Sequence, residues 1–338
     1  MLEAVYVVYT GGTIGMVRTP TGYAPEPGLL EQMTRRLPEL QSNEIPPFFV
    51  NERDPLKDSA DISPADWNEI GEDIAANYDR YGGFIVLHGT DTMAYTASAL
   101  SFMFEGLSKP VVVTGSQIPM CEVRNDAREN LITSLIIAGS ARIPEVCICF
   151  NGRLLRGNRS AKVHSMGFDA FATPDYPTLG DIGIDIDIHH ERVRGSTGEP
   201  FRLQRCSTEP VAALRVFPGI SGDVIRNVTR PPLRGLVLEC YGVGNAPSCD
   251  SKFLEALREA SNRGVVIVDV TQCIRGTVDL TSYAAGSRLA DAGVISGFDM
   301  TVEAALSKLL YLFGRNLSSG DVKREMQRNL RGELTAPG

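Results

Sequence analysis

The chain has 338 residues, of which 43% are hydrophobic and 22% are charged, as is ordinary for a soluble globular protein. This length predicts two domains, because single domains usually hold about 100–200 residues. The formal net charge of −8 argues against a nucleic-acid partner, since such binding depends on clustered Lys and Arg. No segment approaches the ~20 apolar residues that a membrane helix needs, so we expect no membrane partner.

Short apolar runs alternate with amphipathic segments along the chain. The apolar runs predict strands at Val5–Tyr9, Phe84–Leu87, Val111–Thr114, Val146–Phe150, Val211–Val216, Leu236–Cys240 and Val265–Val270. The amphipathic segments predict helices at Pro64–Tyr78, Met93–Leu107, Ala127–Ala141, Ser251–Asn262, Ser282–Ala292 and Met300–Phe313. Ser63 is the expected N-cap of the first of these helices, with Pro64 at its first position.

Strands that are apolar along their whole length and separated by helices indicate βαβ units and a parallel sheet covered on both faces. The alternation weakens between about Thr173 and Gln204 and resumes near Val211. We therefore predict an α/β fold with a larger N-terminal domain at residues 1–190, built on a parallel, flavodoxin- or Rossmann-like sheet. A linker at 191–210 and a smaller C-terminal α/β domain at 211–338 follow.

The cysteines and the N-terminus predict a cytoplasmic protein. Seven cysteines are an odd number, and most lie in or beside apolar runs, which indicates reduced and buried thiols. No secretory signal pattern precedes Val5. Cys147 and Cys149 alternate in an apolar strand, where core packing is a better explanation than metal binding. We expect no metal site.

Small polar loops follow each N-terminal strand. They are Thr10–Gly15, His88–Thr92, Gly115–Gln117 and, beyond the fourth strand, Asn158–Lys162. In an open parallel sheet, ligands bind in the crevice beyond the carboxyl ends of the strands. The sequence therefore predicts an active site that combines glycines, hydroxyls, one carboxylate and one lysine at this edge.

Each loop also has a simpler interpretation. Gly11 and Gly12 would fit a tight turn, and they lack the spacing of a dinucleotide fingerprint or a P-loop. Thr90, Asp91 and Thr92 would fit a helix N-cap, where the helix dipole stabilises a carboxylate. A lone lysine such as Lys162 is most often solvated, and the basic run at 153–162 would fit either a charged face or an anion site.

The hydroxyls in these loops would need a base, because a threonine is a poor nucleophile at its free pKa. No conventional Ser-His-Asp set is present, and His88 is the only histidine next to one of these loops. A lysine is the alternative base, provided that burial and neighbouring groups let it accept a proton.

Taken together, these segments resemble the bacterial-type L-asparaginase family, in its cytoplasmic type I branch. The matching segments are two signatures, a lysine loop, a loop for the substrate carboxylate and a C-terminal segment: Thr10–Gly15, Gly83–Ala97, Arg156–Lys162, Asp58–Asp61 and Tyr241–Pro247. The second signature is long and specific. The resemblance extends to Asn329–Thr335 and so covers essentially the whole chain.

The resemblance implies an amidohydrolase that converts L-asparagine to L-aspartate and ammonia. Thr13 would be the nucleophile that forms a β-aspartyl ester, and Tyr23 would assist it as the site closes. Thr90, Asp91 and Lys162 would form a second hydroxyl–carboxylate–amine set. Backbone N–H groups near Gly12 and Thr90 are candidates for stabilising the oxyanion. No cofactor is implied.

Substrate contacts also follow from the resemblance. Asp58, Ser59 and Ala60 form the loop that receives the α-carboxylate, chiefly through Ser59, while Thr90 and Asp91 lie at the substrate and Asp91 pairs with the α-ammonium. Asn245 matches a residue that reaches a neighbouring subunit's pocket. The expected assembly is therefore a homodimer or a dimer of dimers.

One position departs from the family pattern. Some bacterial cytoplasmic members bind asparagine at a second, regulatory site through an arginine, and this chain has Glu239 at that position. Thr271 and Cys273, which match other residues of the region, are retained. An acidic side chain repels a carboxylate, so we do not expect this mode of regulation.

Three other functions fit parts of the sequence. A subunit of a transfer-RNA amidotransferase would need an additional N-terminal domain and a partner. A fusion with lysophospholipase activity would carry C-terminal repeats. A non-catalytic amino-acid binder would have no need to keep Thr13, Thr90, Asp91 and Lys162 together.

Overall fold

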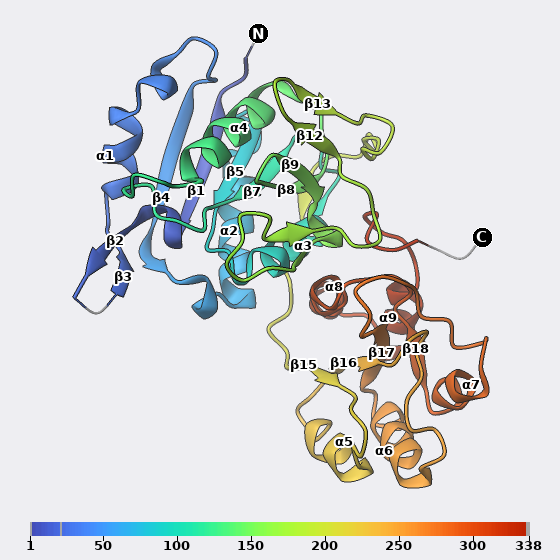
Figure 1. Cartoon of the computed structure of the whole chain (residues 1–338). Coiled ribbons are helices and arrows are strands. Elements are labelled where there is room, and N and C mark those ends of the chain that lie inside the picture. The colour runs from blue at the N-terminus through green and yellow to red at the C-terminus, as the bar shows by residue number, and fades with distance from the viewer. Residues whose placement is uncertain (1, 21, 336–338) are drawn as a thin grey trace. The chain divides into compact units, whose positions relative to one another are not determined.

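The computed structural model describes residues 2–20 and 22–335 (Figure 1). The chain divides into two units, Met1–Leu203 and Gln204–Gly338, and each is described by itself. The linker expected at residues 191–210 spans this division. No helix in the described part is long and apolar enough to cross a membrane.

The first unit is built on an eight-stranded sheet with the order β13-β12-β9-β8-β7-β5-β1-β4. Its parallel part consists of β4 (Phe48–Lys57), β1 (Val5–Gly11), β5 (Gly83–Leu87), β7 (Val111–Thr114) and β8 (Val146–Phe150). Every residue of β1, β5, β7 and β8 is buried, which explains why these four strands are predictable as apolar runs.

Three short strands extend this sheet in antiparallel orientation: β9 (Arg153–Arg156), β12 (Gly180–Ile182) and β13 (Ile186–Ile188). Strands β12 and β13 come from the stretch after Thr173, where the sequence pattern weakens. Each strand has only three residues, and the middle residue of each is exposed, so neither forms an apolar run. Shorter pairs are β2 (Met16–Thr19) with β3 (Gly22–Pro25), β10 (Ala161–Lys162) with β11 (Phe171–Ala172), and β6 (Phe104–Glu105) with β14 (Arg202–Leu203).

The predicted helices cover both faces of the sheet. Helix α4 (Ala127–Ser140) packs on one face, while α2 (Pro64–Asn77) and α3 (Met93–Met103) lie together on the other (Figure 1). The core under α4 includes Cys147 and Cys149, as their place in the strand predicted. Helix α3 ends earlier than predicted because Phe104 leaves the helix to enter β6.

The start of α2 is stabilised as the sequence predicted. The Asp66 carboxylate accepts hydrogen bonds from the backbone N–H of Ser63 at 2.9 Å and from its hydroxyl at 2.7 Å. Helices that the sequence did not predict in this unit are α1 (Leu29–Arg36) and four short 3₁₀ helices: η1 (Thr13–Gly15), η2 (Pro38–Gln41), η3 (Ser59–Asp61) and η4 (Gly157–Arg159).

The second unit holds a separate, fully parallel four-stranded sheet in the order β15-β16-β17-β18. The strands are β15 (Val211–Arg215), β16 (Gly235–Cys240), β17 (Val266–Thr271) and β18 (Val294–Ser296), and the helices are α5 (Gly222–Val228), α6 (Ser251–Asn262), α7 (Ala284–Asp291), α8 (Val302–Gly314) and α9 (Ser319–Met326). The predicted larger and smaller α/β domains are thus both present.

Candidate active site

Three loops at the carboxyl edge of the first sheet are packed so closely that only glycine fits between them. A Cβ atom on Gly12, whose φ is +87°, would lie 2.4 Å from the Cα of Gly89. A Cβ atom on Gly89 would lie 2.6 Å from the Ser59 hydroxyl oxygen. The loop after β1, the loop after β5 and η3 therefore form one continuous surface.

Thr13 lies on this surface at the start of η1. Its side chain is partly exposed, whereas Ile14 and Gly15, which complete the 3₁₀ turn, are buried. The turn is closed by the Gly15 N–H, which donates to the Gly12 carbonyl at 3.3 Å. The turn thus places Thr13 directly after a buried strand.

Thr90, Asp91 and Lys162 form a connected set. The Lys162 Nζ donates to the Thr90 Oγ1 at 2.9 Å and to an Asp91 carboxylate oxygen at 2.6 Å. Thr90 is buried, and the side chains of Lys162 and Asp91 are 17% and 67% exposed. Pairing of β10 with β11 fixes the backbone of Lys162, so this lysine is held rather than free in solvent.

Gln117 also belongs to this set, although the sequence motifs predict no individual role for it. It follows β7 in one of the predicted loops, and its side-chain Oε1 accepts a hydrogen bond from the Thr90 hydroxyl at 3.1 Å. Its position in that loop was the only signal available from the sequence. Its bond to Thr90, 27 residues away in the chain, depends on the fold.

The loop at residues 58–60 is organised by its own hydrogen bonds. Asp58 accepts from the Ala60 N–H at 2.9 Å and thereby caps η3, and Ser59 is buried. The Thr92 hydroxyl donates to the Ser59 carbonyl at 2.6 Å. Thr92 is the N-cap residue of α3, but its side chain is used to tie the two loops together instead of capping the helix.

His88 is a neutral structural residue. It is fully buried, and burial lowers its pKa to about 4. Its Nδ1 lies 2.7 Å from the Gly89 carbonyl, so this nitrogen carries the proton, and its Nε2 lies 2.8 Å from the Thr96 hydroxyl. His88 therefore holds the loop after β5 and does not act as a base for a nucleophile.

Tyr23 lies on β3, in the hairpin that follows η1. Its side chain is 41% exposed, and its hydroxyl donates to Glu122 at 2.6 Å. The Arg18 guanidinium lies 5.7 Å from the centre of the Tyr23 ring. Strand β3 and η1 lie against each other, but no hydrogen bond joins Tyr23 to Thr13 in the described part of the chain.

The remaining predicted residues belong to the second unit. Asn245 closes a turn with Tyr241 through two backbone hydrogen bonds of 2.8 Å. The Thr271 hydroxyl donates to the Gly242 carbonyl at 2.6 Å and accepts from the Cys273 N–H at 3.1 Å.

Glu239, on the strand that leads into this turn, has a cation beside it. Its carboxylate lies 3.6 Å from the guanidinium of Arg215, its direct neighbour on β15. The side chain of Glu239 is 18% exposed and that of Arg215 is 62% exposed.

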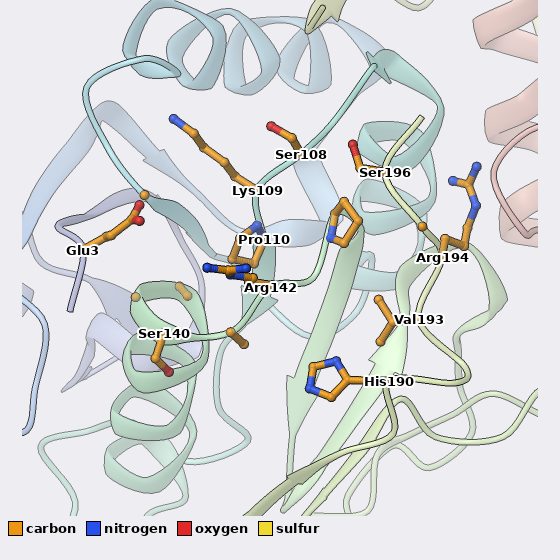
Figure 2. A pocket seen from close by; sticks show the side chains of 16 residues that line it. Glu3, Ser108, Lys109, Pro110, Ser140, Arg142, His190, Val193, Arg194 and Ser196 are labelled. Carbon is orange, nitrogen blue, oxygen red and sulfur yellow. The ribbon is translucent and has the colours of Figure 1, made fainter. Parts of the chain in front are cut away.

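A cavity of about 730 Å³ lies elsewhere in the first unit (Figure 2). It is lined by residues that precede β5 and β7 and by the end of α4, which places it at the amino ends of the parallel strands. Lys109, on its wall, donates to the carbonyls of Tyr78 at 2.5 Å and Tyr81 at 2.8 Å. The cavity contains none of the predicted site residues, and we do not assign the chemistry to it.

Within residues 2–20 and 22–335, no group of three or more His, Cys, Asp and Glu side chains is arranged to hold a metal ion. The chemistry that the described side chains offer is that of a hydroxyl nucleophile supported by a hydroxyl–lysine–carboxylate set. A set of this kind supports attack of a hydroxyl on a carbonyl carbon, which defines a candidate acyl-transfer enzyme.

Comparison with known proteins identifies the family. The model for the asparaginase N-terminal domain matches residues 4–194, and the model for the glutaminase/asparaginase C-terminal domain matches residues 210–326. The chain belongs to the asparaginase family.

Individual relatives match over the full length. L-asparaginase 1 of Escherichia coli K12 is 50% identical over 334 residues, which are 98% of each chain. The crystal structure of L-asparaginase I from Vibrio cholerae is 49% identical, with a TM-score of 0.92 over 99% of this chain and 100% of that one. The L-asparaginase of Thermococcus kodakarensis is 35% identical, with a TM-score of 0.88 over 99% and 100% of the two chains.

Proposed function

We infer that the protein hydrolyses L-asparagine to L-aspartate and ammonia. The observation that carries this inference is the Thr90–Lys162–Asp91 set, connected by bonds of 2.9 and 2.6 Å, beside a threonine in a rigid turn. The set occurs in a chain that is similar over 98% of its length to an L-asparaginase.

In the reaction we propose, the hydroxyl oxygen of Thr13 attacks the side-chain amide carbon of asparagine. The hydroxyl proton passes to the leaving nitrogen, the C–N bond breaks and ammonia departs, which leaves a β-aspartyl ester on Thr13. A water molecule then attacks the ester carbon, aspartate is released and the hydroxyl regains its proton. Backbone N–H groups near Gly12 and Thr90 stabilise the negative oxygen that forms in each half.

Tyr23 and the Thr90–Lys162–Asp91 set share the proton transfers in this scheme. Tyr23 exchanges its bond with Glu122 for one with Thr13 as the hairpin closes over the substrate. The exposure of Tyr23 and its place in a two-stranded hairpin support such a movement. Lys162, held 2.9 Å from the Thr90 hydroxyl, supplies the charge that stabilises a developing alkoxide.

The substrate's charged groups have complementary sites. Asp91 has a carboxylate that is 67% exposed and available to the α-ammonium, although it also pairs with Lys162. Ser59, in the loop of Asp58 and Ala60, receives the α-carboxylate. Ser59 lies directly against Gly89, so both charged groups of the substrate are recognised next to the reacting loop.

We also propose that Asn245 of a neighbouring subunit completes the pocket, and that the protein is a homodimer or a dimer of dimers. The tight turn that presents Asn245 supports this role. Activity should then fall on dilution below the dissociation constant of the dimer. Light scattering that shows a fully active monomer would overturn this part of the proposal.

The proposed location is the cytoplasm. No disulfide joins any of the seven cysteines in the described part of the chain, which suits a reducing compartment. Fractionation of cells that express the full chain tests this, and recovery of the protein with an extracytoplasmic fraction would contradict it.

The function is tested by incubating the protein with L-asparagine and measuring ammonia and aspartate in equal amounts, with L-glutamine in a parallel series. Calorimetry under the same conditions shows whether asparagine binds. Binding without ammonia release would identify a non-catalytic binder and refute the hydrolase.

A further inference from the structure

We propose that Gln117 is a positioning residue that fixes the direction of the Thr90 hydroxyl and its distance from Lys162. This inference rests on the proposed hydrolysis and adds a residue to it. It depends on one side chain that bonds to Thr90 on one side and to the loop after Lys162 on the other.

The orientation of the Gln117 amide follows from its partners. Its Nε2 lies 2.9 Å from the Gly167 carbonyl and 3.3 Å from the Ser165 carbonyl. Carbonyl oxygens only accept hydrogen bonds, so the group that faces them has to be the NH₂ end. The carbonyl end, Oε1, therefore faces Thr90.

This orientation determines the direction of the Thr90 proton. Oε1 has no proton to donate, so Thr90 is the donor in the 3.1 Å bond to Gln117. A hydroxyl has only one proton, and the Thr90 oxygen consequently presents a lone pair to Lys162. The ammonium of Lys162 can donate to that lone pair at 2.9 Å, as the structure shows.

Gln117 is itself held firmly. The backbone N–H groups of Gln117 and Ile118 donate to the Asp126 carboxylate at 2.9 and 3.0 Å. Asn130, on α4, donates to the Gly115 carbonyl at 3.0 Å. A carboxylate and an amide at the start of α4 thus anchor the loop from which Gln117 reaches the site.

The arrangement has a consequence for catalysis. Ser165 and Gly167 follow Lys162 by only a few residues, so Gln117 ties Thr90 to the loop that carries the lysine. Without this tie the Thr90 hydroxyl can rotate and donate elsewhere, and the lysine loop loses two hydrogen bonds. The hydroxyl–lysine contact would then be made in only a fraction of the molecules, and turnover would fall with that fraction.

Gln117→Leu tests the proposal, because it keeps the approximate size and removes both ends of the amide. We expect kcat to fall about 10- to 100-fold and KM to change less than about threefold. Gln204→Leu is the matched control. Gln204 also bridges two carbonyls, those of Arg205 at 3.0 Å and Gly314 at 3.1 Å, but it lies in the second unit. Its variant should keep the kcat of the unmodified protein.

Gln117→Glu provides a second readout that a purely structural role would not move. It keeps an acceptor for Thr90 but places a negative charge near Lys162, which favours the protonated amine. Because the ammonium of Lys162 supplies the stabilising charge in the proposed reaction, we expect the alkaline limb of the kcat profile to move to higher pH in this variant. The pH profile of kcat for Gln117→Glu tests the proposal if Gln117→Leu does not fold.

Folded Gln117 variants with unchanged kcat and an unchanged pH profile would overturn the proposal. So would a loss of rate that appears entirely in KM. A wild-type protein that releases no ammonia from asparagine refutes the proposed function instead, so the two failures are distinguishable.

Discussion

The two units present the same kind of sheet edge, but the loops at these edges bring different groups together. In the first, loops in glycine-tight contact hold Lys162 against a hydroxyl and a carboxylate. In the second, the turn that ends at Asn245 and the neighbouring Thr271 bond mainly to backbone atoms.

The buried polar groups of the two units differ in the same way. His88 in the first unit has partners for both ring nitrogens. Asp269 in the second is fully buried under Gly244, and its carboxylate faces the thiol of Cys240, which is only a weak hydrogen-bond donor. A shared parallel architecture therefore does not specify function. Function depends on which polar groups the loops bring together.

The largest expected effect is that of Thr13→Val, which removes the proposed nucleophile and keeps the shape of the side chain. Turnover should fall by several powers of ten, roughly 10⁴-fold or more, with the fold intact. Steady-state ammonia release measures it. Thr133→Val, which removes a buried hydroxyl from α4, is the control and should stay active. Near-normal turnover by Thr13→Val would show that another group is the nucleophile.

Lys162→Met should lower turnover by about 10³-fold, since methionine keeps the aliphatic stem but cannot donate or accept a proton. Its thermal stability should change little, because Lys162 pairs with an exposed carboxylate. Lys308→Met in the second unit is the matched comparison.

Lys308 forms a fully buried ion pair with Glu333, and removing one partner of such a pair costs about 3–5 kcal/mol of unfolding free energy. Replacing lysine by methionine should thus lower turnover at position 162 and lower the free energy of unfolding at position 308. A Lys162→Met protein that is merely less stable and still fast would identify Lys162 as an ordinary structural lysine.

Asp269→Asn should stabilise the protein above neutral pH. Burial raises the pKa of the Asp269 carboxyl to about 7, whereas an unfolded aspartate ionises near pH 3.8. Between these values the folded state binds more protons than the unfolded state, so stability falls as pH rises. The free energy of unfolding falls by at most about 4 kcal/mol by pH 7 for this reason. Asparagine does not ionise, so the variant does not lose this stability. Denaturant unfolding at pH 5 and pH 8 compares the two proteins, and an equal pH dependence would contradict the prediction.

His88 predicts the opposite pH dependence for the first unit. Its folded pKa of about 4 lies below the ordinary 6.5, so the unfolded state binds more protons between these values. The contribution of neutral His88 to the free energy of unfolding is fully present above pH 6.5. It falls by roughly 3 kcal/mol as the pH falls toward 4. His88→Asn should flatten this part of the stability profile, although it lowers stability at pH 7. A profile that keeps its slope in the variant would assign the acid sensitivity to other groups.

The sequence predicted the parts of the fold that are buried on both faces. Val5–Tyr9 and its neighbouring strands are continuous apolar runs, and they form the sheet centre. The edge strand β4 was missed because charges and Pro55 interrupt it. Helices α5 and α9, which have seven and eight residues, were missed, whereas α7, also of eight residues, was predicted.

The candidate site shows the same limit. Loops that follow strands locate Thr13, Thr90 and Lys162 on one edge before any coordinates are known. The bonds that orient these groups join distant segments, as when Gln117 contacts both Thr90 and Gly167. Tyr23 and Glu122 are likewise 99 residues apart. No local pattern encodes such pairs, because the whole fold determines them.

The smallest expected effect concerns regulation by asparagine at the second unit. Glu239 lies 3.6 Å from Arg215, so the nearest cation is already paired with a carboxylate. An effector carboxylate would meet the like charge of Glu239. Losing one charge-assisted bond costs on the order of 1.5–3 kcal/mol, or about one to two powers of ten in effector affinity. Allosteric coupling requires differential binding, so an effector that does not bind at working concentrations cannot regulate. We therefore expect the dependence of rate on asparagine concentration to be hyperbolic or only weakly sigmoidal.

The test is a rate curve for the unmodified protein beside Glu239→Arg. That variant would face Arg215 across the strands, and like charges directly opposite each other are destabilising. The combined variant Arg215→Ser, Glu239→Arg removes this repulsion and leaves one free guanidinium at the position. If charge alone prevents regulation, only the combined variant gains a sigmoidal curve. A sigmoidal curve for the unmodified protein would mean that a regulatory site operates despite Glu239. Its cation would then come from another residue, and the Glu239 carboxylate, paired with Arg215, would not repel the effector.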